Sequence, residues 1–317
     1  MEVTDYPTNL YKSAESYAKM CDFYDRSLAA LPVPMESRYV ETRFGSTHML
    51  VAGPEDAAPF ILIQGMAGSA ILWHHQIADF SARHRIYALD TVGQPGRSAP
   101  NPPSLLNDGY MNWLLDVLDG LGLTRAHLAG ISTAGYGIIR FGIIHPERVD
   151  KAVLLSPLRL ARANLNGRRW VGNAMKQDTE DDKLEDRLTA REFSVSSGQT
   201  QFDRQLARAM ALATRHYRLG VGMGIPPEAP RWRKFVAGSR VLSTLMSPLP
   251  KRELRKFTAP ALVVMGEKET LYNPQKAARR AAEMPNASVM IVPDAGHAAV
   301  FDRPETINPI ILDFLTH

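Results

Sequence analysis

The chain has 317 residues, of which 45% are hydrophobic and 22% are charged, so it is long enough for one large core with an inserted subdomain. Its single cysteine, Cys21, excludes a framework of internal disulfides. The net charge is +4, and residues 158–258 hold 20 of the 37 basic and 10 of the 33 acidic residues. Basic and acidic residues are interleaved there without a nucleic-acid motif. We therefore interpret them as solvated helix faces and predict no nucleic-acid partner.

The N-terminal residues have neither the basic stretch nor the apolar stretch of a signal peptide. No run elsewhere in the chain is long and apolar enough to span a bilayer. These observations predict a soluble, cytoplasmic protein without a membrane span.

The predicted elements begin with a helical arm over residues 9–30, followed by a β-hairpin at residues 38–54 that turns near Gly45. Short apolar runs then alternate with amphipathic segments. The predicted strands are residues 59–65, 86–90, 126–132 and 151–157. The predicted helices are residues 73–85, residues 108–123, and a segment at 133–149 whose helix ends before Pro146.

The alternation stops after residue 157, where the sequence indicates helices and loops, and resumes at residue 259. The later strands are predicted within the segments at residues 259–269 and 287–297, each of which ends in a loop, and the later helices are predicted at residues 273–284 and 304–315. Repeated strand–helix units predict a mostly parallel central sheet flanked by helices. We therefore predict an N-terminal arm at residues 1–37, an α/β core at residues 38–157 and 259–317, and an inserted helical cap at residues 158–258.

A serine lies where the strand at residues 126–132 turns directly into a helix. The sequence there is HLAGISTAG, with Gly130 before Ser132 and Ala134 after it. A sharp strand–turn–helix junction with small flanking residues is typical of a nucleophile elbow. The alternative is that Ser132 only caps the following helix. Because a serine nucleophile also requires a base, the assignment depends on the rest of the chain.

A glutamate and a histidine follow in the order that such a site needs. His297 stands in DAGHAAVFDRPE, on the loop after the last predicted strand, and is predicted to be the base. Glu269 stands in VVMGEKE, after the preceding strand, and is predicted to orient the imidazole. Glu267 and Asp294 are the alternatives for this acid. Agreement among three separate loops favours a Ser132–His297–Glu269 triad.

An oxyanion site needs two backbone N–H donors. Thr133, which follows the serine, is predicted to supply one, and Met66, in the loop QGMAGSA, is predicted to supply the other. Gln64 opens this loop where a histidine is usual, and as a neutral amide it can brace the loop but cannot carry a charge. The loop LDTVGQPGRS is predicted to shape the pocket floor and to position Asp90 without taking part in the chemistry.

No cofactor is predicted, because the chain has neither a P-loop nor a glycine-rich dinucleotide motif after a strand. His74 and His75 are adjacent but have no neighbouring cysteine or carboxylate cluster, so no metal site is predicted. The remaining histidines other than His297 are predicted to be structural or exposed.

The motifs QGMAGS, LDTVGQPGRS, HLAGISTAG, VVMGEKE and DAGHAAVFDRPE resemble, in this order, those of the α/β-hydrolase superfamily. The segments YVETRFGSTHMLVAGPEDAAP and MNWLLDVLDGLG, with the glutamate after GEK, are similar to bacterial carboxylesterases that include the naproxen esterases. The resemblance implies an α/β-hydrolase fold with an inserted cap. It also implies the following roles: Ser132 as nucleophile, Glu269 as acid, His297 as base, and Met66 and Thr133 at the oxyanion hole. Gln64 and Ala134 depart from the usual residues of this pattern.

We therefore expect a serine hydrolase that cleaves a small, apolar carboxylic ester through an acyl-enzyme, with the cap as an apolar wall. Two alternatives remain. The same pocket could cleave carbon–carbon bonds or cyclise a biosynthetic intermediate, for which Gln64 is the motivating feature, or the protein could bind a small molecule without turnover. Epoxide hydrolysis and dehalogenation are not expected, because both need a carboxylate at position 132. The arm could pack on the cap or on the second subunit of a homodimer.

Overall fold

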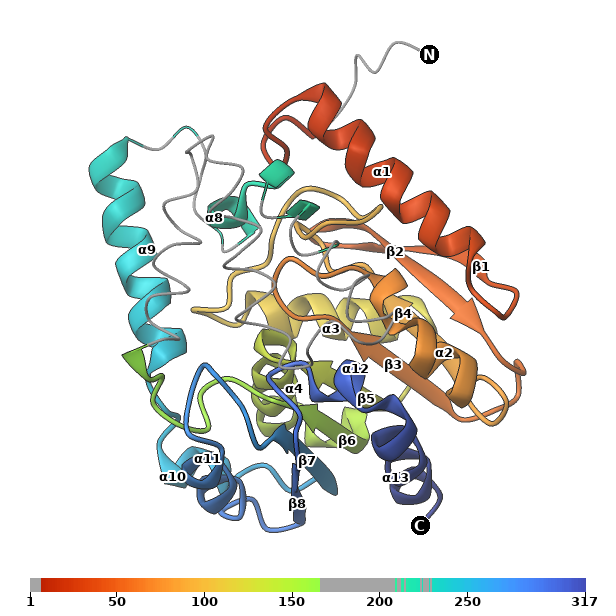
Figure 1. The fold of residues 1–317 in the computed structure, drawn as a ribbon, viewed down its shortest axis with the longest axis vertical. Coiled ribbons are helices and arrows are strands. Elements are labelled where there is room, and N and C mark those ends of the chain that lie inside the picture. The colour runs from red at the N-terminus through yellow and green to blue at the C-terminus, as the bar shows by residue number, and fades with distance from the viewer. Residues whose placement is uncertain are drawn as a thin grey trace.

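The computed structural model has an eight-stranded sheet between two layers of helices (Figure 1). It describes residues 7–165 and 230–317, together with residues 209, 212, 213, 215–222, 224 and 228. The strand order is β1-β2-β4-β3-β5-β6-β7-β8, in which β1 and β2 form an antiparallel hairpin, β2 is antiparallel to β4, and all other pairs are parallel. The strands are β1 (Glu36–Thr42), β2 (Gly45–Ala52), β3 (Pro59–Ile63), β4 (Arg85–Leu89), β5 (Ala126–Ile131), β6 (Val149–Leu155), β7 (Ala261–Gly266) and β8 (Ala287–Val292). The predicted fold class is confirmed.

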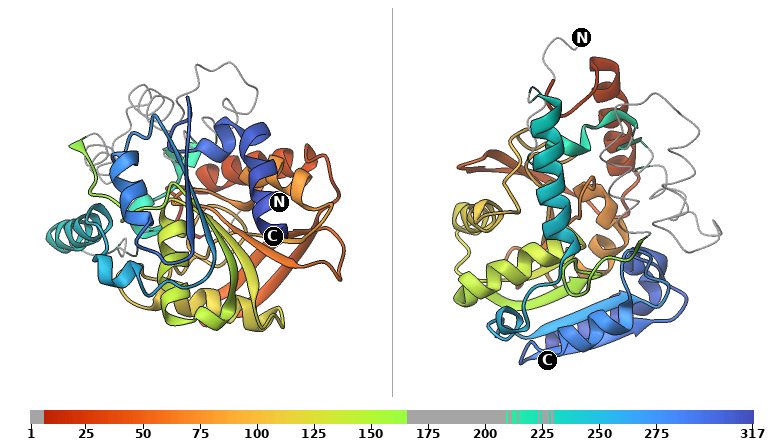
Figure 2. Two further views of the ribbon diagram at one scale, coloured as in Figure 1. Left: turned by 90° about the horizontal axis from the view of Figure 1, so that it is seen from below. Right: turned by 90° about the vertical axis from the view of Figure 1, so that its left-hand side faces the viewer.

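Helices cover both faces of the twisted sheet (Figure 2). One layer holds α1, α2 and α13, and the other holds α3, α4 and α11. The helices are α1 (Ala14–Ala29), α2 (His74–Phe80), α3 (Gly109–Gly120), α4 (Thr133–Ile144), α8 (Leu219–Gly222), α9 (Arg231–Met246), α10 (Lys251–Leu254), α11 (Pro274–Ala281), α12 (Ala299–Asp302) and α13 (Pro304–Thr316). Short 3-10 turns, η1 (Ala70–Trp73) and η2 (Pro146–Arg148), precede α2 and follow α4. As predicted, α4 ends before Pro146, which has no N–H to continue the helix.

Alternate side chains of a single strand enter two different cores. On β3, Ile61 and Ile63 pack with the layer of α3 and α4, whereas Phe60 and Leu62 pack with the layer of α1 and α2. All four are fully buried. Because both faces of a parallel strand are covered in this way, the strand appears in the sequence as a continuous apolar run instead of an alternating one.

The carboxyl ends of the parallel strands meet at one edge, where backbone hydrogen bonds join successive loops. The N–H of Ser132, just after β5, donates to the carbonyl of Leu155 at 2.9 Å, and the N–H of Ser156, just after β6, donates to Val264 at 2.7 Å. The loop after β7 is joined to the loop after β8 by a 2.9 Å bond from the N–H of Lys268 to the carbonyl of Ala295. The predicted site residues that follow these strands are therefore carried on connected loops.

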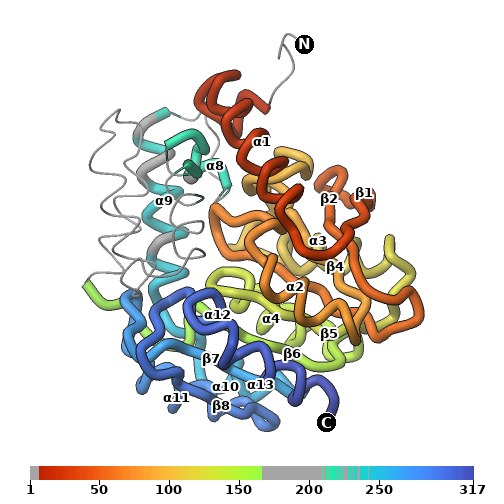
Figure 3. The backbone as a smooth tube through the Cα atoms, turned by 45° about the vertical axis from the view of Figure 1, so that its right-hand side comes forward, coloured from red at the N-terminus to blue at the C-terminus, as the bar shows by residue number. Residues whose placement is uncertain are grey.

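The N-terminal arm packs on the core and on a short segment of the predicted cap range (Figure 3). Tyr11 forms an isolated antiparallel bridge with Tyr217, and the N–H of Arg218 donates to the carbonyl of Leu10 at 2.7 Å. Residues 166–208, a long central stretch of the predicted cap, lie outside the described residues, so the cap boundaries stay a prediction. Within the described residues, no helix has the length and apolar character needed to cross a membrane.

The buried histidine His127 is expected to make the stability of the fold depend on pH. His127 on β5 is buried, with Nδ1 3.3 Å from Oδ2 of Asp150. Desolvation lowers the pKa of His127 from 6.5 to about 4, and the Asp150 carboxylate opposes this only in part. Between these two values the unfolded chain binds more protons than the folded chain, so stability falls as the pH falls through this window.

We expect the midpoint of thermal unfolding, measured between pH 7 and pH 4, to fall more steeply with acidity in the wild type than in His127→Gln, which gains no proton. Equal slopes for the two proteins would contradict the assignment.

Candidate active site

Ser132 stands at the turn between β5 and α4 with a backbone conformation that non-glycine residues rarely adopt. Its φ is 57° and its ψ is −114°. A non-glycine residue in such a region costs about 1–3 kcal/mol and persists only where the surroundings hold it. Here the Ser132 N–H donates to Leu155, and its carbonyl accepts from the N–H of Leu158 at 3.1 Å. The structure thus has the sharp strand–turn–helix junction that the sequence predicts, with Ser132 at its apex.

The glycines around Ser132 are required by close packing. A Cβ at Gly130 would lie 2.7 Å from Ile138 Cδ1, and a Cβ at Gly135 would lie 2.8 Å from Cβ of Pro157. Ala134, where the usual pattern has glycine, is 1% exposed and its methyl group is accommodated in the core. The turn therefore tolerates alanine at 134, while the crowded position in this chain is Gly135.

His297 and Glu269 form a buried pair at the same edge of the sheet. Nδ1 of His297 lies 2.7 Å from Oε2 of Glu269, and both side chains are almost fully buried. The other carboxylate oxygen, Oε1, accepts a 2.8 Å hydrogen bond from the N–H of Leu271. A carboxylate at Nδ1 favours the tautomer with the proton on Nδ1, which makes Nε2 the acceptor. Burial, followed by the charge of Glu269, raises the pKa of the neighbouring Tyr272 well above its ordinary value, so this phenol stays neutral.

The two alternative acids lie on the surface. Glu267 and Asp294 are both exposed, and Oε2 of Glu267 accepts a 3.3 Å hydrogen bond from the N–H of Asp294. Asp294 also pairs with Lys268 at 2.7 Å, and this hydrogen bond lowers the pKa of its carboxyl group. Of the three candidate carboxylates, Glu269 is the one that contacts His297.

Asp302 and Gly266 hold the loop that carries His297. The N–H of Gly296 donates to Oδ2 of the buried Asp302 at 2.9 Å, a contact that the sequence analysis missed. Asp302 lies five residues after His297 and belongs to the motif DAGHAAVFDRPE. The neighbouring residues gave no sign that its carboxylate would bind the backbone of the loop that carries His297. A Cβ at Gly266 would lie 2.2 Å from the carbonyl oxygens of both Ala295 and Gly296.

Gly266→Ala is therefore expected to displace the loop that carries His297. Overpacking a tight site costs about 1–3 kcal/mol, so the thermal midpoint should fall together with any activity that depends on His297. Gly220→Ala is the matched control, because no atom of the described residues lies within 4 Å of its added Cβ. Thermal melts and ester turnover of both variants test this, and unchanged turnover in Gly266→Ala would show that the loop position is not critical.

The two predicted oxyanion residues line one pocket. Met66 and Thr133 both face it, together with Gln64, Gln94 and others. The Met66 loop lies close to the serine, since a Cβ on Gly65 would be 3.1 Å from Cβ of Ser132. Thr133 is the first residue of α4, so its N–H has no acceptor within the helix.

Gln64 supports the loop after β3, residues 64–70 with the sequence QGMAGSA, by packing, and this loop is called the oxyanion loop below after its predicted role. It is 6% exposed, and a Cβ on Gly68 would lie 2.9 Å from its own Cβ. Among the described residues, no hydrogen-bond partner is found for its Nε2. Hydrogen-bond bracing by this amide was expected from the sequence, and the contact seen is packing against the loop.

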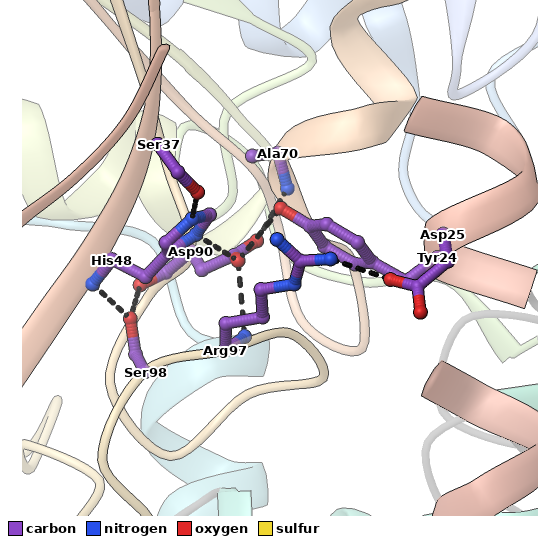
Figure 4. Close-up of polar contacts among 8 residues, drawn as sticks. All are labelled: Tyr24, Asp25, Ser37, His48, Ala70, Asp90, Arg97 and Ser98. Atoms are coloured by element: carbon purple, nitrogen blue, oxygen red, sulfur yellow. Dashed lines mark hydrogen bonds and ion pairs between the residues drawn. The ribbon is translucent and has the colours of Figure 1, made fainter. Parts of the chain in front are cut away.

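A second serine–histidine–carboxylate array lies on the β1–β2 side of the sheet (Figure 4). Oγ of Ser37 is 2.6 Å from Nε2 of His48, and Nδ1 of His48 is 2.8 Å from Oδ2 of Asp90. His48 and Asp90 are fully buried. His48 was predicted to be structural or exposed, and it is fully buried.

The carboxylate of Asp90 is saturated by hydrogen bonds that hold loops together (Figure 4). Oδ1 accepts from the N–H of Ala70 at 2.7 Å, and Oδ2 accepts from the N–H of Arg97 at 3.0 Å and from the hydroxyl of Tyr24 at 2.9 Å. Ala70 follows the oxyanion loop, and Tyr24 belongs to α1. Asp90 is therefore a structural anchor that joins the loop after β3, the loop after β4 and the arm.

The two adjacent histidines do not form a metal site in the part of the chain that the structure describes. No group of three histidine, cysteine, aspartate or glutamate side chains that could hold a metal ion occurs there. The rings of His74 and His75 are 4.1 Å apart, and burial lowers the pKa of His74 to about 4.

Comparison with known proteins places this architecture in one family. The sequence pattern of the alpha/beta hydrolase family matches residues 60–310. The chain is 31% identical over 320 residues to the carboxylesterase YbfK of Bacillus subtilis (strain 168), covering 96% of each chain.

Two crystal structures from Bacillus subtilis have the same fold with a TM-score of 0.76. Carboxylesterase CesB (YbfK) is 29% identical, with 95% of this chain and 98% of that chain covered. Naproxen esterase (carboxylesterase NP) is 26% identical with the same coverage. The chain therefore belongs to the alpha/beta hydrolase family, within which it is similar along nearly its whole length to Bacillus subtilis carboxylesterases.

Proposed function

We propose that this protein is a carboxylic ester hydrolase that works through a Ser132–His297–Glu269 triad. The observation that carries the proposal is the buried 2.7 Å pair of His297 and Glu269, carried on loops that are connected by hydrogen bonds to the strained turn at Ser132. Similarity to carboxylesterases over nearly the whole chain supports ester hydrolysis as the reaction.

In the proposed mechanism, Oγ of Ser132 attacks the ester carbonyl while Nε2 of His297 takes its proton. Glu269 holds the imidazole with its proton on Nδ1 and stabilises the imidazolium that forms. The N–H groups of Met66 and Thr133 stabilise the oxyanion of the tetrahedral intermediate. His297 then gives its proton to the leaving alcohol, and water releases the acyl group from Ser132 by the same route.

The proposed substrate is a small ester with an apolar body. Apolar side chains surround the catalytic edge on both faces of the sheet, and the pocket beside Met66 and Thr133 also contains Val92, Pro103 and Leu105. Ligand pockets are mostly apolar with a few placed polar groups, and the oxyanion donors would provide these here.

The test is to incubate the wild-type protein with a fluorophosphonate probe and to map the labelled peptide by mass spectrometry. We expect one phosphonyl group on Ser132, together with turnover of p-nitrophenyl esters of graded acyl length. Labelling elsewhere, or none, would exclude Ser132 as the nucleophile. Labelling of Ser132 without turnover of any ester in the series would contradict ester hydrolysis and favour carbon–carbon bond chemistry in the same pocket.

A further inference from the structure

Gln94, in the loop after β4, joins two segments that are distant in sequence. Its side chain is 8% exposed. Oε1 accepts a hydrogen bond from the N–H of Ala67 at 2.8 Å, and Nε2 donates to the carbonyl of Gly222 at 2.9 Å. The amide of one side chain therefore connects the oxyanion loop after β3 with the last residue of α8.

On the oxyanion side, this contact holds a turn in a strained form. The N–H of Gly68 donates to the carbonyl of Gly65 at 3.2 Å, which closes a four-residue turn with Met66 and Ala67 at its centre. Ala67 has a φ of +64°, whereas Met66 is not among the positive-φ residues. Positive φ at the third position alone is the signature of a type II turn, a place that favours glycine over alanine.

The N–H that Gln94 binds belongs to the central peptide of this turn, between Met66 and Ala67. The orientation of the central peptide is what distinguishes type II from type I turns. A flip would turn the Met66 carbonyl oxygen toward Oε1 of Gln94, where two acceptors would repel each other. Gln94 therefore stabilises the backbone conformation of the residue whose own N–H is proposed to bind the oxyanion.

On the other side, the α8 segment is packed tightly against the loop after β4. The hydroxyl of Tyr217 donates to the carbonyl of Gly93. A Cβ on Gly222 would lie 1.8 Å from the Tyr217 hydroxyl oxygen and 2.9 Å from Nε2 of Gln94, so this approach requires glycine. Tyr217 is in turn bridged to Tyr11 of the arm. The arm, α8, Gln94 and the oxyanion loop thus form one continuous series of contacts.

From these contacts we propose that Gln94 is a positioning residue, through which the α8 segment holds the oxyanion loop in its working conformation. This role rests on the proposed function, because it acts on the N–H of Met66. An oxyanion contact is made in the transition state and not in the ground state. Loss of the positioning therefore lowers kcat and leaves KM nearly unchanged.

The test compares Gln94→Met, which keeps the length but makes neither hydrogen bond, with Gln94→Glu, which keeps an acceptor for Ala67. We expect Gln94→Met to lower kcat on a short p-nitrophenyl ester by about tenfold or more, short of the 100-fold to 1000-fold for removing a donor outright. Gln94→Glu should recover part of this loss. Arg85→Met is the control, because Arg85 is as buried as Gln94 and its guanidinium donates a hydrogen bond to the carbonyl of Gly53. Arg85 is the first residue of β4, whereas Gln94 lies in the loop after the other end of this strand.

Arg85→Met is expected to lower the thermal midpoint without lowering kcat. If Gln94→Met has wild-type kcat, or if its kcat falls no more than that of Arg85→Met, the positioning role is wrong while the triad stands. Fluorophosphonate labelling separates the two failures. Full labelling of Ser132 with equal rates in the wild type and in Gln94→Met overturns only the role of Gln94, whereas unlabelled wild-type protein overturns the proposed function and this role together.

Discussion

Ser132→Ala is expected to lower kcat/KM for an ester substrate by about 10⁵-fold to 10⁶-fold, because it removes the only atom proposed to form the acyl-enzyme. The remaining turnover would come from the oxyanion donors and substrate binding acting on water. The variant should fold normally. Alanine retains the Cβ that Ser132 already carries at its φ of 57°, and the backbone bonds to Leu155 and Leu158 do not involve the hydroxyl.

The measurement is steady-state hydrolysis of a p-nitrophenyl ester by protein purified with and without the substitution, with thermal melts to confirm folding. Ser156 offers a matched control, because it ends the neighbouring strand β6, is buried and also has a positive φ of 40°. Ser156→Ala should keep activity close to that of the wild type. An activity in Ser132→Ala that stays within tenfold of the wild type would require a different nucleophile.

Glu269→Gln is expected to lower kcat by about 10⁴-fold with little change in KM, as loss of the carboxylate does in other serine hydrolases. The N–H of Leu271 donates to Oε1 of Glu269, so the glutamine oxygen is expected to stay on that side. The amide NH₂ would then face Nδ1 of His297, where the carboxylate stood. It would donate to Nδ1 and place the imidazole proton on Nε2, so His297 could no longer accept the serine proton.

Two further variants give this prediction its controls. Glu269→Asp keeps the charge but shortens the side chain by one methylene, so it should lose less activity than Glu269→Gln. Glu267→Gln should have no effect, because Glu267 is exposed and its carboxylate accepts a hydrogen bond from the N–H of Asp294. Equal losses in Glu269→Gln and Glu267→Gln would rule out a specific role for the Glu269 carboxylate.

The elements and the nucleophile turn could be predicted from the sequence because local rules govern them. Buried parallel strands such as β3 and β5 are short continuous apolar runs, with Gly65 two residues after β3 and Ser132 and Thr133 directly after β5. Positions 130 and 135 hold glycine because neighbouring atoms leave no room for a Cβ. Because such crowding selects small residues next to the turn, the turn at Ser132 could be recognised from the sequence alone.

The choice of contacts was decided only by the tertiary structure. The sequence predicted Glu269 as the partner of His297 but left Glu267 and Asp294 as alternatives near the same strand ends, and the packing of the loops shows that Glu269 is the one buried against His297. Likewise, nothing near Gln94 in the chain indicates Ala67 or Gly222 as partners, which are 27 and 128 residues away. Pairings of this kind depend on how separate strands and loops are assembled, and no local pattern of residues encodes that arrangement.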